Sequence, residues 1–165
     1  MILAIDVGNT NTVLGCLKGD HIEFTLRIRS DRDKTADEYL LLIDGLLRNQ
    51  GVDPASLEGG ILSSVVPELR IVMKNAMERL TGKSFLAVGT GIKTGLDIRT
   101  DNPAQLGGEL LCAIVGALQR CTPPCVVVNF DTATTLLAVD STGAGDNFAA
   151  GFLSSILHGK TFRES

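Results

Sequence analysis

The chain has 165 residues, of which 44% are hydrophobic, so it is long enough to bury a core in one domain with part of a second. With 15 basic and 19 acidic residues the formal net charge is -4, and no run of lysine or arginine forms a basic stripe. This balance excludes nucleic acid as an expected partner.

The sequence gives no indication of a metal cluster or a membrane segment. None of the cysteines forms the Cys-x-x-Cys pair of a zinc site, and we expect reduced, mostly buried thiols at Cys16, Cys112, Cys121 and Cys125. Met1 leads directly into an apolar segment carrying Asp6, with neither a basic leader nor an apolar stretch of about 18 residues. A cytoplasmic protein with no membrane partner is therefore expected.

Three strands are predicted at the start of the chain. The apolar run 2–6 ends on a carboxylate and leads into the turn-forming residues 8–11. Residues 13–17 and 22–28 then alternate partly between apolar and polar, around the turn residues 18–20. The pattern is typical of antiparallel strands.

Helices and strands alternate along the next part of the chain. Helix starts are indicated by the capping box Thr35-Ala36-Asp37-Glu38 and by Pro67. In order, we expect a helix 35–49, a strand 60–66, a helix 67–82, a strand 85–88, a helix beginning at Pro103, a strand 125–130 and its hairpin partner 134–140. This order predicts an α/β protein whose mixed sheet is covered by helices.

The turn after the first strand has the chemistry of a phosphate-binding loop. Gly8 lets the backbone approach a ligand, the turn exposes N–H groups, and the hydroxyls of Thr10 and Thr12 can donate hydrogen bonds. Asp6, at the strand end, can orient hydrated Mg²⁺, which prefers carboxylate and water ligands. An ordinary hairpin turn made of Gly, Asn and Thr is the alternative, and spacing alone leaves both readings open.

Several separate segments resemble, in the same order, the motifs of type III pantothenate kinases. They are the residues 5–12, Thr35-Ala36-Asp37-Glu38-Tyr39, Ser63-Ser64-Val65-Val66-Pro67, 95–98 with 101–103, 106–110 and Thr132-Ala133-Thr134-Thr135. The resemblance covers about residues 1–142. It implies an actin-like ATPase fold (ribonuclease H-like), a mixed sheet with helices on its faces, with the second domain truncated. The implied parts are an N-terminal domain 1–120, the start of a second domain 121–142 and a tail 143–165.

The resemblance also implies an activity and a set of site residues. The activity is transfer of the γ-phosphate of ATP to the primary hydroxyl of pantothenate, in coenzyme A biosynthesis, by a homodimer that needs Mg²⁺ and a monovalent cation, K⁺ or NH₄⁺. The implied ATP-binding residues are Asp6, Val7, Gly8, Asn9, Thr10, Asn11, Thr12, Val13 and Thr132. The implied substrate-binding residues are Gly107, Gly108, Glu109 and Leu110, and the implied metal contacts are Asp6 for Mg²⁺ through water and Asn129 for the monovalent cation.

Four positions in and near these motifs depart from the family pattern. Glu109 stands where the family has the aspartate that takes the substrate proton, and Leu110 stands where the family often has arginine. Asn129 and Asp131 replace an aspartate and a glycine of the second phosphate motif. A misplacement of ~1 Å can cost about 100-fold in rate, so we expect weak or absent turnover. Glu109 as a mere favourable charge in a first helical turn is the alternative.

The segment after Asp140 resembles a different family. Gly143-Ala144-Gly145-Asp146 is similar to the signature of ribokinase-type sugar kinases. That resemblance implies an anion hole made by backbone N–H groups and a base at Asp146, while a glycine-rich turn before a terminal helix is the alternative. Two other functions therefore stay open, a ribokinase-like fragment that uses Asp146 and a non-catalytic nucleotide-binding or dimerisation module.

Overall fold

The structure is a computed structural model that describes residues 1–89, 92, 107–130 and 134–139. The chain forms two compact units, Met1–Glu109 and Leu110–Ser165. The division falls just inside the helix that begins at Gly108, whereas the sequence led us to expect a first domain that extends to residue 120.

A five-stranded mixed sheet forms the centre of the first unit, in the order β3-β2-β1-β4-β5. The strands are β1 (Ile2–Val7), β2 (Asn11–Lys18), β3 (His21–Arg29), β4 (Gly59–Ser64) and β5 (Phe85–Ala87). The first three pair antiparallel as predicted, while β4 runs parallel to β1, and β5 runs parallel to β4. Parallel strands need a crossover connection, and the segment between β3 and β4 supplies one that contains a helix.

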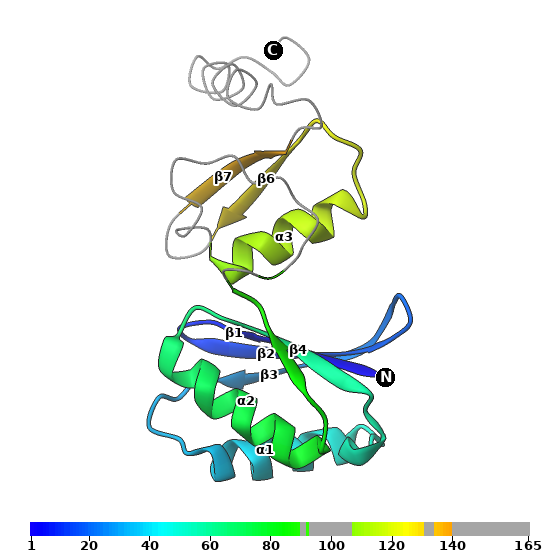
Figure 1. Cartoon of the computed structure of the whole chain (residues 1–165), viewed down its shortest axis with the longest axis vertical. Helices are drawn as coiled ribbons and strands as arrows, with labels where there is room; N and C mark the ends of the chain where they lie inside the picture. Colours follow the sequence, from blue (N-terminus) through cyan, green and yellow to red (C-terminus); the bar gives the residue numbers. More distant parts are fainter. Residues whose placement is uncertain (90–91, 93–106, 131–133, 140–165) are drawn as a thin grey trace. The chain divides into compact units, whose positions relative to one another are not determined.

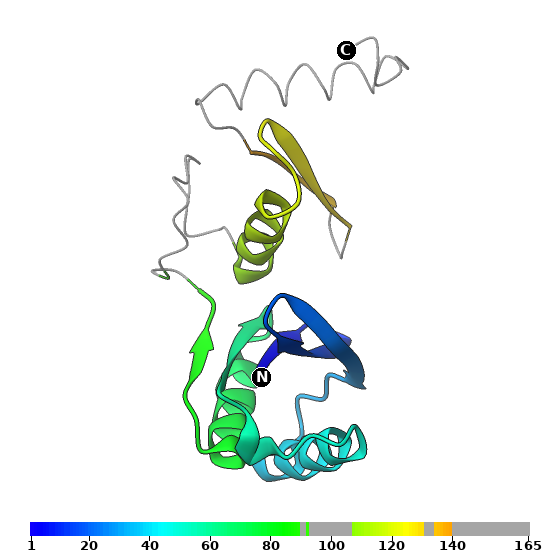
Figure 2. The same cartoon turned by 90° about the vertical axis from the view of Figure 1, so that its right-hand side faces the viewer.

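Two helices cover one face of this sheet, α1 (Ala36–Asn49) and α2 (Pro67–Thr81), as Figure 1 and the turned view in Figure 2 both show. The core lies between them and the sheet. From β1 it takes alternate residues, Leu3, Ile5 and Val7, which are at most 3% exposed. Because side chains alternate along a strand, the intervening residues of β1 face the other way.

Local signals place both helices as the sequence predicted. At α1, Glu38 N donates to Thr35 Oγ1 (3.3 Å), and Thr35 N donates to Glu38 Oε2 (2.7 Å), which completes the capping box. Helix α2 begins at Pro67, whose missing N–H costs nothing there, and is capped by Gly82 at φ 68°. The sequence therefore fixes the helix ends locally.

A buried tyrosine anchors the connection from β3 to α1. Tyr39 is fully buried, and its hydroxyl accepts a hydrogen bond from Asp31 N (2.8 Å) and donates one to Asp31 O (2.9 Å). The lysine at position 34 forms an ion pair with the Asp31 carboxylate (2.9 Å). These contacts hold the residues that follow β3 next to the end of the sheet.

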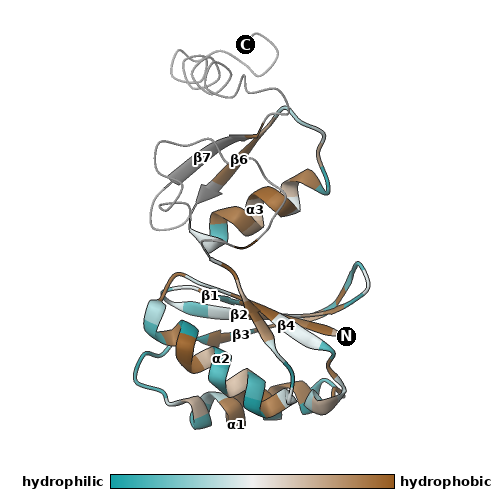
Figure 3. Ribbon diagram, in the orientation of Figure 1, coloured by the Kyte–Doolittle hydropathy of each residue, from teal (hydrophilic) through white to brown (hydrophobic). Residues whose placement is uncertain are grey.

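The second unit contains a helix and an antiparallel strand pair. Helix α3 (Gly108–Leu118) is apolar over most of its length, as Figure 3 shows, and β6 (Cys125–Phe130) pairs with β7 (Thr134–Val139) as predicted. The helix begins at Gly108, after a non-helical Gly107, and the predicted start at Pro103 lies outside the described residues. No helix in the described ranges has the length and apolar character needed to span a bilayer.

The expectation of mostly buried thiols is wrong. Of the four cysteines only Cys16 is buried, and burial raises the pKa of its thiol. Cys125 is half-buried, and Cys112 and Cys121 are exposed. Cys112 lies on α3, and Cys121 lies just after this helix. At both positions, apolar neighbours in the sequence do not imply that the side chain is buried.

Candidate functional site

The turn between β1 and β2 is held closed by its own backbone. Gly8 N donates to Asn11 O (3.0 Å), and a Cβ added at Gly8 would lie 3.0 Å from the same oxygen. That approach is tighter than real Cβ contacts usually allow, so the turn needs glycine here. It therefore has the form that the sequence predicted for a phosphate loop, although a hairpin turn without a ligand has the same form.

Three side chains of this turn are exposed, those of Asn9, Thr10 and Asn11. The loop is held from its far side, because Ser30 N, just beyond β3, donates to Thr10 O (2.9 Å). The predicted contact residues in the turn are thus presented on a fixed backbone.

Thr12 is placed differently from what the sequence suggested. Its side chain is fully buried on the helix-covered face, and its hydroxyl lies 2.9 Å from Ser30 Oγ. We expected its hydroxyl to donate a hydrogen bond to a bound phosphate, but β2 already begins at Asn11, so strand alternation turns Thr12 inward. The hydroxyl pair joins β2 to the end of β3.

Asp6 and Val13 lie on the opposite face from Thr12. Asp6 is exposed, and in the register of the sheet it stands beside Val13 of β2 and Ser63 of β4. Among the described residues, no group of three or more histidine, cysteine or acidic side chains is arranged to hold a metal ion. A single exposed carboxylate nevertheless suits Mg²⁺, which keeps most of its water ligands.

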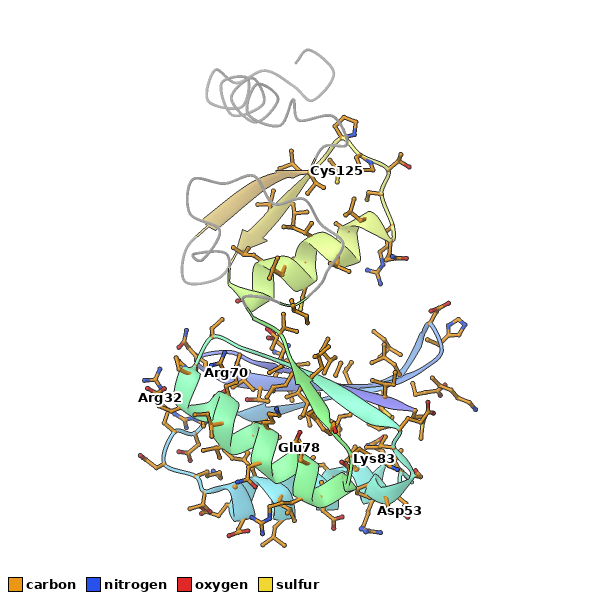
Figure 4. The ribbon with its side chains drawn as sticks, in the orientation of Figure 1. Arg32, Asp53, Arg70, Glu78, Lys83 and Cys125 are labelled. Carbon is orange, nitrogen blue, oxygen red and sulfur yellow. The ribbon has the colours of Figure 1, made fainter. Side chains whose placement is uncertain are left out.

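One cation near the loop was missed by sequence reasoning. Arg32 is exposed, and its Nη2 donates to Asn9 Oδ1 at 3.4 Å. Figure 4 shows its side chain at the end of the first unit where α2 begins. The contact joins residues that are 23 positions apart, so no local pattern signals it. A guanidinium beside an exposed turn favours a phosphate ligand.

The two serines at the end of β4 differ sharply. Ser64 is a local structural residue, because its hydroxyl donates to Val66 O (2.8 Å) and accepts from Val66 N (3.1 Å). Ser63 is only 6% exposed, and its hydroxyl has no hydrogen-bond partner among the described residues. The motif in which both lie was noted from the sequence, but their different roles depend on which face each one occupies.

The predicted substrate-binding residues begin α3. A Cβ added at Gly108 would lie 3.2 Å from Val88 Cγ1 and 3.5 Å from Ser63 Oγ, so within the first unit this glycine lies close against the end of β4. Glu109 is half-buried in the first turn of the helix, and Leu110 is the first residue of the second unit. Asp6, Ser63 and Gly108 are thereby brought to one end of the sheet.

The structure describes no side chain for the other predicted site residues. Asn129 lies in β6 opposite Thr135, and its side chain is not among those described. Thr132, Asp131 and the whole segment 143–165 lie outside the described residues.

The fold is shared with a solved kinase-like protein. A putative 2-dehydro-3-deoxygalactonokinase from Sinorhizobium meliloti aligns with a TM-score of 0.51 at 16% identity, over 96% of this chain and 58% of that chain. Together with the mixed sheet and its helices, this match confirms the actin-like ATPase fold class. At such low identity it carries the fold alone.

The sequence comparisons define the family more closely. The family described as type III pantothenate kinase matches residues 2–158. The type III pantothenate kinase of Moorella thermoacetica is 42% identical over 143 residues, covering 87% of this chain and 56% of the relative. That of Geobacillus kaustophilus is 44% identical over 139 residues, covering 82% of this chain and 52% of the relative. The chain belongs to the type III pantothenate kinase family.

The extent of these matches adds two facts. The chain spans about half the length of the curated relatives it matches. The family match runs to residue 158, past the limit of about 142 that we set from the motifs, and so includes Gly143 to Asp146. The resemblance of that segment to ribokinase-type enzymes stays a prediction.

Proposed function

We propose that the protein phosphorylates pantothenate with ATP, giving 4'-phosphopantothenate in coenzyme A biosynthesis. The observation that carries this proposal is the family match over residues 2–158. The turn at Gly8 supports it, because it offers exposed polar groups and a neighbouring guanidinium at one end of the sheet. Since the chain spans about half the length of its relatives, activity of the chain by itself is part of the proposal.

At the phosphate end, the residues 6–11 and Val13 bind ATP. The backbone around Gly8, with Asn9 and Thr10, contacts phosphate oxygens, and Arg32 adds a positive charge beside them. Thr12 positions the loop through Ser30. Mg²⁺, when bound, neutralises charge on the phosphates, and Asp6 would hold it through water. Positioning and charge neutralisation supply most of the catalysis in phosphoryl transfer.

At the acceptor end, Glu109 is the candidate base. The pantothenate hydroxyl oxygen forms a bond to the γ-phosphorus while the bond from that phosphorus to the β–γ bridging oxygen breaks, and ADP leaves. The hydroxyl proton passes to the Glu109 carboxylate. Gly107 and Gly108 let the backbone approach the substrate, and Leu110 adds an apolar contact at the position where the family often has arginine.

Further parts of the proposal come from the family. Thr132 contributes to phosphate binding, and the amide oxygen of Asn129 contacts a monovalent cation, K⁺ or NH₄⁺. The protein acts as a homodimer in the cytoplasm. The departures at Glu109, Leu110, Asn129 and Asp131 lower turnover, because they fall on groups that position or neutralise the reacting phosphoryl group.

The changed positions also favour one alternative, a nucleotide-binding or dimerisation module without catalysis. Two of these changes, Leu110 and Asn129, remove a charged group that the family uses near the phosphates. The third, Asp131, introduces a carboxylate there. Saturable ATP binding with no substrate-dependent turnover would favour this alternative. A sugar kinase that uses Asp146 is the other alternative, and it requires sugar-dependent loss of ATP.

The test is ADP release in the presence of Mg²⁺, K⁺ and pantothenate, run beside a panel of hexoses and ribose. We expect slow, pantothenate-dependent release that is lost in Glu109→Ala. Glu68→Ala is the matched control, because Glu68 is an exposed glutamate in the first turn of α2, and it should keep the unmodified rate. Sugar-dependent release that disappears in Asp146→Asn would contradict the proposal, as would pantothenate-dependent release that survives in Glu109→Ala.

A further inference from the structure

A buried hydroxyl at the end of β4 has no hydrogen-bond partner in the part of the chain that the structure describes. Ser63 is 6% exposed, and its Oγ makes no hydrogen bond to any described residue. Leaving a buried polar group unpaired is unfavourable, and such groups in folded proteins call for an explanation, such as a catalytic role or a bound water or ion. The neighbouring Ser64 is different, since its Oγ exchanges two hydrogen bonds with the backbone of Val66.

The hydroxyl lies beside the metal and phosphate end of the proposed site. Strands β1 and β4 run parallel, and Asp6 and Ser63 are partners in their register. Register partners on adjacent strands point to the same face, about 4.8 Å apart. Leu62, the residue before Ser63, points to the opposite face and is fully buried in the core. Adjacent residues of β4 therefore serve packing on one face and present a polar group on the other.

The start of α3 approaches Ser63 from its other side. A Cβ on Gly108 would lie 3.5 Å from Ser63 Oγ, and 3.2 Å from both Cγ1 and the carbonyl oxygen of Val88. Glycine therefore permits a close approach of the helix start, and the N-terminal end of a helix favours a bound anion. Glu109, the candidate base, follows directly. Ser63 thus stands between a carboxylate suited to Mg²⁺ and the acceptor end of the proposed site.

We propose that Ser63 is a substrate-binding residue whose hydroxyl donates a hydrogen bond to a non-bridging oxygen of the γ-phosphoryl group. The inference rests on the proposed function and deepens it by assigning a contact to the group that is transferred. Phosphoryl oxygens only accept hydrogen bonds, and a serine hydroxyl without another partner is free to donate. ADP lacks the γ-phosphoryl group and makes no such contact.

The test compares Ser63→Ala with Ser64→Ala in the whole chain. Calorimetric titration with Mg²⁺ and a non-hydrolysable ATP analogue, and separately with ADP, gives affinities, and thermal unfolding gives stability. In Ser63→Ala we expect the affinity for the ATP analogue to fall about tenfold or more, as for a hydrogen bond to a charged group, with ADP affinity and Tm unchanged or Tm slightly raised. In Ser64→Ala we expect a lower Tm and unchanged affinities.

Several results would overturn the inference. If Ser63→Ala and the unmodified chain bound the ATP analogue with equal affinity, the proposed contact to the γ-phosphoryl group would be contradicted. Equal loss of affinity for the analogue and for ADP, or a fall in Tm as large as that of Ser64→Ala, would assign Ser63 a structural role. No nucleotide binding by the unmodified chain would overturn both this inference and the proposed function. If Ser63→Ala lost affinity for the ATP analogue but not for ADP, and the unmodified chain showed no pantothenate turnover, the contact would be supported. Only the proposed kinase activity would then be contradicted.

Discussion

The two faces of the five-stranded sheet carry different kinds of residue. On the face covered by α1 and α2, Leu3, Ile5 and Val7 of β1 are almost wholly buried among apolar side chains. On the other face, Asp6 is exposed beside Ser63. Since neighbours in a strand point to opposite faces, one short strand supplies both the core and the candidate chemistry. We therefore expect substitutions on the covered face to change stability, and substitutions of the adjacent residues on the other face to change ligand binding.

The largest expected effect lies on the core face. Leu62 is fully buried, and Leu62→Ala removes apolar contacts and leaves a cavity, which typically costs about 2–5 kcal/mol. Denaturant unfolding followed by circular dichroism measures the loss. The adjacent Ser63→Ala is the control, and it should unfold at the same denaturant concentration as the unmodified chain or a higher one. A loss of stability of similar size in both variants would mean that the two faces do not separate as we describe.

A smaller effect is expected where β2 meets the end of β3. Ser30→Ala leaves the fully buried Thr12 hydroxyl without its partner at 2.9 Å, at a cost of about 1–3 kcal/mol. Thermal and denaturant unfolding measure this cost. Thr10 should stay in place, because its carbonyl bonds to the backbone N–H of residue 30, which the substitution keeps. An unchanged stability would show that the Thr12 hydroxyl is satisfied in another way.

The smallest effect is expected at the start of α1. The Thr35 backbone N–H, and next its hydroxyl, donate to the Glu38 carboxylate and lower the pKa of Glu38. A lowered pKa in the folded state means that the carboxylate stabilises the fold above its ordinary pKa of about 4.3, and that this contribution is lost as the pH falls through the lowered value. Glu38→Gln should therefore lower Tm slightly at pH 7.

The pH dependence of that difference provides the check. Thermal unfolding of the unmodified chain and of Glu38→Gln should give Tm values that differ near pH 7 and converge as the pH falls below the lowered pKa of Glu38, since both side chains are then neutral. The substitution should leave nucleotide affinity unchanged at pH 7. A difference in Tm that stays constant or grows in acid would assign the effect to something other than the charge of Glu38.

Much of the fold could be predicted because its signals are local. The capping box at Thr35, Pro67 at a helix start and Gly82 at a helix end each act within a few residues, and each is confirmed. The hairpin of β2 and β3 was also predicted, but its boundary was not. We predicted that the strand starts at Val13, whereas β2 starts at Asn11. Because Thr12 was therefore not assigned to the strand, its burial was not predicted.

The candidate site was harder to predict because its contacts are long-range. The motif that contains Asp6 predicted a phosphate loop, but it gave no sign of Arg32, which contacts Asn9 and follows Asp31, whose backbone bonds to the Tyr39 hydroxyl. The unpaired state of Ser63 likewise depends on how β1, β4 and the start of α3 meet. No spacing rule within a single segment contains this information.

The central proposal is that the polar end of this sheet binds the substrates of pantothenate phosphorylation, and that the changes at Glu109, Leu110, Asn129 and Asp131 slow the reaction. The most direct measurement is pantothenate-dependent ADP release by the unmodified chain and by Glu109→Asp, which restores the side-chain length found in the family. We predict a slow rate that rises tenfold or more in Glu109→Asp, because a misplacement of ~1 Å can cost about 100-fold. A rate that falls or stays at background in Glu109→Asp, with the chain still folded, would contradict the assignment of Glu109 as the base.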